Sequence, residues 1–320
     1  MEQTIGIDVS KATFDLAVVS ESKTEQESFR NDEEGFEALE QWLEDRSIDE
    51  GRMCMEATGT YGLKLAARLI DGGHELSVVN PARVQAYAES ELCRNKTDRS
   101  DARLLARFCD AHDPQMWQPT DEKWARLQEL VRRIQSLKQT RTQEKNRVQK
   151  PKIGDEVTDS LNAHIDYLDS AIEKLWAEID RLVDNCSEAS RAVELVESIP
   201  GIGRRTAIQL VAEIRDIDRF DSAKKLAGHT GIPPQNVESG SSRDDPASMS
   251  KKGPARLRGL LWMPAMSARR WNPIVREFCD RLEEKGKHSR TIMGAAMHKL
   301  IRLVYGVWNN DEPFDPEYEA

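Results

Sequence analysis

The feature that most constrains the fold is a long stretch, residues 121–187, in which Pro151 and Gly154 are the only proline and glycine. Apolar residues three and four positions apart lie on one side of a helix. Such steps occur on both sides of the interruption, at Leu127, Leu130, Val131, Ile134 and Leu137 and then at Leu161, Ile165, Leu168, Ile172, Leu175 and Ile179. The stretch predicts two long helices that pair as a helical hairpin or as an intermolecular coiled coil.

The residues before this stretch alternate between apolar runs and helical patterns. Residues 4–9 and 13–19 predict two strands of a hairpin, with Ser10–Ala12 as the turn. Shorter apolar runs predict strands at 52–56 and 76–80. Helices are predicted at 33–45, 60–71, 82–89 and 97–110. This order is typical of an α/β domain.

The predicted elements divide the chain into four parts. We expect an α/β domain at residues 1–118, a helical coiled-coil linker at 119–188 and a mostly helical domain at 189–310. Residues 311–320 are acidic and contain proline, so we expect a loose tail.

The charge of the chain is unevenly distributed. The net charge of −10 speaks by itself against a nucleic-acid partner. However, residues 1–50 carry 15 acids and 4 bases, whereas residues 131–152 carry 8 bases and one acid and residues 241–305 carry 14 bases and 6 acids. A solvated helix face explains either basic section alone, but the asymmetry of the whole chain favours an anionic partner.

The cysteines and the hydropathy pattern indicate the compartment. Five widely spaced cysteines without a C-x-x-C motif argue against a disulfide framework or a zinc ribbon. No apolar run is long enough to span a membrane, and the N-terminus has no basic segment of a signal peptide. We therefore expect a cytoplasmic protein without a membrane partner.

Four carboxylates in the first domain form the candidate metal site. Asp8 lies within an apolar strand pattern, where an acid is costly unless it is paired or binds a cation. Glu56 ends another apolar strand, and Asp98 and Asp101 lie three residues apart on one side of a predicted helix. Alone, Glu56 fits a surface acid and Asp98 an acid at a helix N-terminus. Together, carboxylates that converge from several elements predict a site for divalent cations of the kind used in phosphoryl transfer.

The sequence blocks around these acids resemble a known family. The hairpin-first α/β arrangement resembles the RNase H-like fold of polynucleotidyl transferases, and in particular its RuvC-like branch. Over residues 4–108, four blocks are similar in order and spacing to those of the DEDD insertion-sequence transposases, the insertion-sequence family one-ten; they are Gly6–Lys11, Glu56–Tyr61, Val79–Pro81 and Lys96–Ala102. The resemblance implies that Asp8, Glu56, Asp98 and Asp101 are the metal-binding acids of this family, with Mg²⁺, or alternatively Mn²⁺, as the ion.

Two loops in the C-terminal part are candidates for contact with nucleic acid. Residues 198–203 and the helix that follows predict a helix-hairpin-helix turn, in which Gly201, Gly203 and Arg204 would meet a phosphate. A plain connection between two helices is the alternative. The second loop, residues 231–240, contains a Ser-Gly pair that is by itself typical of a turn.

This second loop also resembles the Pro-x-x-x-x-Ser-Gly block of the same family. The resemblance implies that Ser239 is the nucleophile. Glu238 stands where the family usually has glutamine, and Ser241 and Ser242 are rivals for the same role.

The resemblance to the family also covers residues 190–308, and this part contains basic residues close to the loop. The block 250–258 is similar to the family's Lys-x-Gly-Asn-x-x-Leu-Arg, with Pro254 in place of asparagine, which suits the start of a helix. The six histidines show no ligand spacing. We expect phosphate contacts from Lys251, Lys252, Arg256 and Arg258 near the serine and from Arg132, Arg133 and Arg141 on the first long helix.

The resemblance implies a transposase or recombinase that cuts and rejoins the DNA of a mobile element through a phosphoserine intermediate. It also implies a bridge RNA that pairs with donor and target DNA. The two catalytic domains would meet across the subunits of a homo-oligomer, a dimer or a tetramer.

Three other functions are compatible with parts of the sequence. A RuvC-like nuclease would cut branched DNA with water and leave Ser239 unused. Another possibility is an inactive copy that only binds nucleic acid. Glu238 and Pro254 differ from the residues that the family usually has, so this possibility stays open. An actin-like kinase or ATPase would match Gly6–Lys11 as a first phosphate loop, but the second phosphate loop and the adenosine-binding segment are missing.

Overall fold

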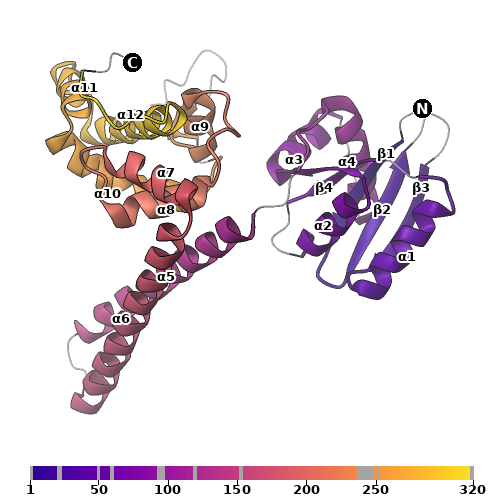
Figure 1. The fold of residues 1–320 in the computed structure, drawn as a ribbon, viewed down its shortest axis with the longest axis horizontal. Coiled ribbons are helices and arrows are strands. Elements are labelled where there is room, and N and C mark those ends of the chain that lie inside the picture. Colours follow the sequence, from indigo (N-terminus) through magenta and orange to yellow (C-terminus); the bar gives the residue numbers. More distant parts are fainter. Residues whose placement is uncertain are drawn as a thin grey trace. The chain divides into compact units, whose positions relative to one another are not determined.

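The structure, a computed structural model, forms two compact units, residues 1–119 and residues 120–320 (Figure 1). It describes the residues in these ranges: 3–19, 24–48, 51–57, 61–91, 98–117, 121–150, 154–235, 248–250 and 252–317.

The first unit is built on a five-stranded sheet in the order β3-β2-β1-β4-β5. The predicted hairpin is confirmed, because β1 and β2 pair antiparallel, while β4 and β5 follow β1 in parallel. The strands are β1 (Thr4–Val9), β2 (Thr13–Val19), β3 (Thr24–Arg30), β4 (Arg52–Glu56) and β5 (Glu75–Val79). The mixed sheet with its helices confirms the α/β class expected for this part of the chain.

The sequence analysis missed strand β3. Its sequence, TEQESFR, is polar, and Phe29 is its one buried side chain. β3 pairs only with β2 and lies at the edge of the sheet, so neither of its faces needs an apolar run. Pairing with a neighbouring strand, and not hydrophobic periodicity, makes this segment a strand.

The two faces of the sheet carry different helices. The odd-numbered residues of β1, Ile5, Ile7 and Val9, share one core with α1 (Glu33–Glu44) and α2 (Leu63–Asp71). Because strand side chains alternate between faces, the even-numbered residues of β1 face the opposite side. That side is covered by α4 (Asp98–His112), which contacts β1, β2 and β4 and packs against α3 (Pro81–Ser90).

Gly6 allows α4 to approach β1 through its backbone. A Cβ atom on Gly6 would lie 1.9 Å from the carbonyl oxygen of Ala102 and 2.4 Å from the amide nitrogen of Ala106. Both atoms belong to the helix backbone, so neither can turn away as a side chain would. Any residue larger than glycine at this position must therefore push the helix off the sheet.

In the second unit, α5 (Glu122–Val148) and α6 (Asp155–Asp184) pack against each other as a helical hairpin (Figure 1). Of the two predicted arrangements, the structure shows the intramolecular one. The predicted stripes form its core: Ile134 on α5 and Ile172 and Ile179 on α6 are buried. Trp176 is 1% exposed and lies in the same core, although its indole N–H has no hydrogen-bond partner among the described residues.

The rest of this unit is mostly helical, as predicted. Its elements are α7 (Ser187–Glu197), α8 (Arg204–Ile214), α9 (Ala223–Thr230), β6 (Pro234–Gln235), β7 (Ser248–Met249), α10 (Ala255–Trp271), α11 (Pro273–Glu284) and α12 (Ser289–Asn309). Pro254 lies at the N-cap of α10, one residue before the first helical position, where proline is most favoured.

The prediction of a loose C-terminal tail is wrong for residues 311–314. Arg191 on α7 donates to the carboxylate and the carbonyl oxygen of Asp311, at 2.7 Å each. The amide of Phe314 donates to the Ser198 hydroxyl at 2.8 Å, and its ring packs on the core. These contacts are made to residues far away in sequence, which the acidic composition of the tail does not reveal. Among the described residues, no helix combines the length and apolar character of a membrane span.

We predict that Gly6→Ala lowers the free energy of unfolding of the first unit by about 2–3 kcal/mol, because the added methyl group overpacks a backbone contact. The matched control is Gly306→Ala on α12, where no atom lies within 4 Å of the added Cβ. That substitution should raise stability by about 0.5–1 kcal/mol through helix propensity. Chemical unfolding followed by circular dichroism measures both, and equal stability of the Gly6→Ala variant and the wild type would contradict the packing argument.

Candidate functional site

Strand register brings two of the predicted acids together. Asp8 is near the end of β1 and Glu56 is the last residue of β4, which runs parallel to β1. The last register pair between the two strands is Ile7 with Met55, and the next step along both strands reaches Asp8 and Glu56. The two carboxylates therefore lie side by side at the carboxyl ends of neighbouring parallel strands, where α/β sheets place their sites.

The third acid comes from the helix that covers the same face. Asp8 and Gly6 point to the same side of β1, because they are two residues apart. Gly6 contacts Ala102, and Asp101 directly precedes Ala102 in the first turns of α4. Asp8, Glu56 and Asp101 are all half-buried on this side of the sheet. Asp98 begins α4, but its side chain lies outside the described residues.

The donor chemistry of this site fits a hard divalent cation. Carboxylate oxygens are the ligands that Mg²⁺ prefers, and here they come from two strands and one helix. Within the described ranges, no group of three or more His, Cys, Asp or Glu side chains lies close enough together to hold a metal ion. The assignment of the four acids as metal ligands therefore stays a prediction.

Asp15 is a further carboxylate of this face, and the sequence analysis missed it. Antiparallel pairing places Asp15 of β2 directly opposite Asp8, and such partners point to the same side of the sheet. Asp15 is half-buried. The short turn between the two predicted strands could have revealed this pairing. A hairpin closed at Ser10 and Thr13 pairs position 8 with position 15.

Two buried thiols meet between β4 and α4. Cys54 on β4 is fully buried, and Cys109 on α4 is 2% exposed. The hydrogen bond with Cys109, together with burial, raises the pKa of the Cys54 thiol. Cys54 is therefore protonated at neutral pH and acts as a small packing residue between sheet and helix.

The predicted nucleophile lies outside the described residues, as do its neighbours Glu238, Ser241 and Ser242. The structure does describe the residues on either side of segment 236–247, which contains these serines. β6 and β7 pair antiparallel, with Pro234 opposite Met249, and the amide of Ser250 donates to the carbonyl oxygen of Pro233 at 3.1 Å. The two ends of the serine segment, residues 236–247, are therefore joined at their base.

Close backbone packing supports this base. Gly231 ends α9 with a φ of +68°, a left-handed conformation that favours glycine. A Cβ on Gly253 would lie 1.9 Å from the carbonyl oxygen of His229, so both glycines are needed for the contact. Arg258 completes it, because its guanidinium donates to the carbonyl oxygens of Thr230 at 3.1 Å and Gly253 at 2.5 Å.

The predicted phosphate-binding residues have different surroundings. Arg258 holds the base of the serine segment, as described above, while Lys252 and Arg256 are exposed and Lys251 lies outside the described residues. Arg133 is also exposed. Three arginines form ion pairs: Arg132 with Glu213, Arg204 with Asp184 and Arg141 with Asp169. The Arg204–Asp184 pair is exposed, and exposed ion pairs contribute little to stability, so Arg204 can exchange its partner for a phosphate. Arg132 instead pairs with the buried side chain of Glu213, and Arg141 is itself partly buried.

The predicted helix-hairpin-helix turn joins α7 to α8. Gly201 has a φ of +109°, and its Cβ position is occupied by the backbone of Ala268 on α10, at 2.6–2.7 Å. Gly203 is exposed and precedes the first residue of α8. The turn thus uses Gly201 for packing and leaves Gly203 and the N-terminus of α8 open on the surface.

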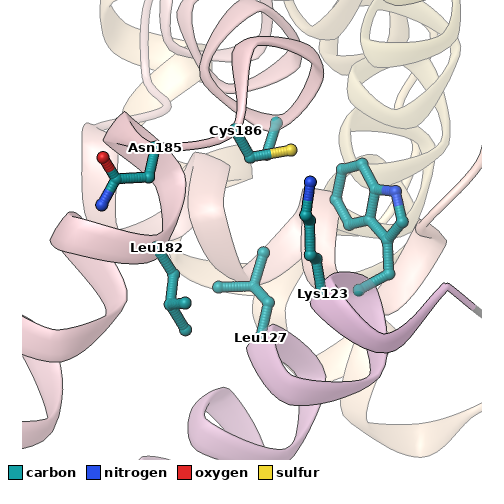
Figure 2. A pocket seen from close by; sticks show the side chains of 7 residues that line it. Lys123, Leu127, Leu182, Asn185 and Cys186 are labelled. Carbon is teal, nitrogen blue, oxygen red and sulfur yellow. The ribbon is translucent and has the colours of Figure 1, made fainter.

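A cavity of about 100 Å³ lies where α5 begins, α6 ends and α7 begins (Figure 2). Its lining is mostly apolar and includes Trp124, Leu127, Leu182 and Cys186, together with Lys123. None of the predicted site residues lines this cavity. It is a packing feature of the helix junction.

Comparison with known proteins identifies the class. Residues 5–151 match a transposase family defined by the DEDD acids, and residues 193–280 match the transposase IS116/IS110/IS902 family. Fold and matches together define an enzyme that acts on DNA, a transposase. The chain belongs to the IS110/IS116/IS902 family of transposases, which confirms the resemblance seen in the sequence blocks.

Several relatives are similar over most of the chain. The pilin gene-inverting proteins of Moraxella bovis and Moraxella lacunata are each 34% identical over 315 residues, which is 97% of both chains. The transposase for insertion sequence element IS1111A of Coxiella burnetii is 25% identical over 243 residues, covering 67% of this chain and 65% of the relative.

We predict that Arg258→Ala lowers the free energy of unfolding of the second unit by about 1.5–3 kcal/mol, because two carbonyl oxygens lose a charged donor. Arg256→Ala is the matched control, since Arg256 is exposed on the same helix, and its effect should stay within about 0.5 kcal/mol. Urea unfolding measures both variants. Equal stability of the two would show that Arg258 does not hold the base of the serine segment.

Proposed function

We propose that this protein is a recombinase that cuts and rejoins the DNA of a mobile element through a serine nucleophile and metal-binding acids. The observation that carries the proposal is the register of β1 and β4, which puts Asp8 beside Glu56 under the helix that bears Asp101. The two similar Moraxella proteins are named for inverting a pilin gene. Their similarity over almost the whole chain supports inversion of a DNA segment as one outcome of the same chemistry.

We also propose that the first unit has the RNase H-like fold in its RuvC-like form. The sheet order, with an antiparallel meander followed by two parallel strands, supports this assignment. In this proposal, residues 1–118 are the domain of the acids, residues 119–188 a helical linker, and residues 189–310 the domain of the serine, with a helix-hairpin-helix at Ser198–Gly203.

The acids have the role of holding the metal. Asp8, Glu56, Asp98 and Asp101 would bind Mg²⁺ or Mn²⁺ through their carboxylate oxygens. A bound divalent cation polarises a phosphate and stabilises the charge on the attacking and leaving oxygens. The carboxylates on β1 and β4 keep their mutual position because they extend from paired strands of a packed sheet.

The serine has the role of the nucleophile. The Ser239 hydroxyl loses its proton and attacks a DNA phosphodiester, so that an Oγ–phosphorus bond forms and the bond to one sugar oxygen breaks. The released sugar hydroxyl takes up a proton. A sugar hydroxyl of another strand then attacks the phosphoserine, which rejoins the DNA and frees the serine. The pairing of Pro234–Gln235 with Ser248–Met249 supports this role, because it fixes the two residues that flank segment 236–247 next to each other.

The basic residues have the role of holding nucleic-acid backbones. Lys251, Lys252 and Arg256 would bind phosphates near Ser239, with Gly203 and Arg204 at the turn between α7 and α8. The basic residues of α5 would hold a bridge RNA that pairs with donor and target DNA. The active form would be a dimer or a tetramer of this chain.

We predict that Asp8→Asn and Glu56→Gln each reduce Mg²⁺-dependent DNA cleavage by about 100-fold or more, because each removes a charged ligand. Asp71→Asn is the control, since Asp71 is exposed at the end of α2. Cleavage of element-end DNA is measured with protein purified together with its RNA. Cleavage at the wild-type rate by both variants would contradict the metal site.

We predict that Ser239→Ala abolishes the covalent protein–DNA adduct, whereas Ser241→Ala and Ser242→Ala retain it. The adduct is detected by denaturing gel electrophoresis and located by peptide mass spectrometry. Loss of the adduct only in Ser241→Ala or Ser242→Ala would move the nucleophile to that serine. Nicks without any adduct in the wild type would favour the RuvC-like nuclease, and binding of nucleic acid without cleavage would favour an inactive copy.

A further inference from the structure

Asn31 connects the two loops that follow the candidate acids. It stands between the end of β3 and α1, and its side-chain amide donates to the carbonyl oxygen of Ser10 at 2.9 Å and to that of Tyr61 at 3.2 Å. Its backbone amide donates to the carbonyl oxygen of Ala12 at 2.9 Å. Ser10 is two residues beyond Asp8, and Tyr61 is five residues beyond Glu56.

The chemistry of this contact suits asparagine. Both partners of the side chain are carbonyl oxygens, which only accept hydrogen bonds, so the group between them must donate twice. The Asn31 Nδ2 atom carries two hydrogens and can serve one carbonyl with each. An aspartate has no donor, and a serine has only one.

The residues next to the two carbonyl partners of Asn31 have close contacts of their own. In the β1–β2 turn, the Ser10 hydroxyl donates to the carbonyl oxygen of Thr13 at 2.7 Å and accepts from the amide of Thr13 at 3.1 Å. On the other side, Gly62 is buried directly after Tyr61, and a Cβ there would lie 2.9 Å from the sulfur of Met55. A link between two rigid segments transmits position, whereas a link between mobile ones would not.

The acids lie one step beyond the last register pair between β1 and β4, while Asp8 stays paired with Asp15 of β2 and Glu56 with Val79 of β5. The register pairs between β1 and β4 end at Ile7 with Met55, so Asp8 and Glu56 come one step later. β1 ends one residue after Asp8, at Val9, and β4 ends at Glu56 itself. Asn31 bridges the two chains on the far side of the acids, so each carboxylate lies between a strand pair and this bridge.

We infer that Asn31 is a positioning residue, which sets the separation of the Asp8 and Glu56 carboxylates by tying the Ser10 turn to the Tyr61 loop. This inference rests on the proposed function, because it assumes that the two acids share a metal ion. Asn31 does not touch the metal or the DNA in this role; it acts through the backbones that carry the acids.

The test measures metal binding directly. Mn²⁺ is titrated into the full-length chain of Asn31→Leu, which keeps the shape of the side chain but removes both donors, and affinity is read by calorimetry. Thr13→Val is the matched control, because it alters the same turn, where Thr13 Oγ1 lies 3.2 Å from the Ser10 hydroxyl, and leaves both Asn31 side-chain bonds in place. We expect Mn²⁺ affinity to fall about tenfold in Asn31→Leu and to stay at the wild-type value in Thr13→Val. Asn31→Asp should resemble Asn31→Leu in the Mg²⁺ concentration needed for half-maximal DNA cleavage.

The outcomes separate this inference from the proposed function. Loss of Mn²⁺ binding in Asp8→Asn with wild-type affinity in Asn31→Leu would overturn the role of Asn31 and leave the metal site standing. Wild-type Mn²⁺ affinity in Asp8→Asn would overturn the metal site and this inference with it. A fall in melting temperature of Asn31→Leu without a change in affinity would show that Asn31 has a structural role only.

Discussion

The approach of α4 to the central strand is the contact on which the candidate site depends. A helix usually packs on a sheet through side chains on both surfaces, which keeps the two backbones apart. At Gly6 there is no side chain on the strand, and the carbonyl oxygen of Ala102 and the amide of Ala106 occupy the place of a Cβ. The helix that carries Asp101 therefore lies against the strand that carries Asp8. A glycine two residues before an acid is thus a packing requirement that also brings the helix of Asp101 against the strand of Asp8.

The same principle operates at the base of the serine segment. Gly231 and Gly253 let two backbones meet, and Arg258 satisfies the carbonyl oxygens that this contact leaves without helical partners. In both places, glycines allow close backbone contact next to residues assigned to the chemistry. Such contacts tolerate less movement than side-chain packing, because backbone atoms have no alternative rotamers. This rigidity suits groups that must meet a phosphodiester in one geometry.

The charged residues show how tertiary structure modifies a charge pattern. The basic section 131–152 looks like a uniform surface for an anion when read along the sequence. In the structure, Arg132 pairs with Glu213 and Arg141 with Asp169, while Arg133 is exposed. The acids that neutralise these arginines come from α8 and α6, at separations that no local count of charges includes. A nucleic acid that binds here must compete with these ion pairs for the two arginines.

The sequence by itself determined the elements whose pattern is local and the class of enzyme. β1, β2 and the two long helices follow from apolar residues at steps of two, three and four, because side chains on a buried face must be apolar. Asp8 and Glu56 could be singled out because they lie in or at the end of apolar runs, and Asp101 because it lies three residues from Asp98 on one side of a predicted helix. Only the tertiary structure decided that β3 is a strand and that Asp15 lies opposite Asp8. It also decided that Arg258 binds the carbonyl oxygens of Thr230 and Gly253, and that Asn31 binds those of Ser10 and Tyr61. The physical reason is the same in each case: these features depend on hydrogen bonds and register between segments that are distant in sequence, and a polar residue carries no local sign of which distant carbonyl or carboxylate it will meet.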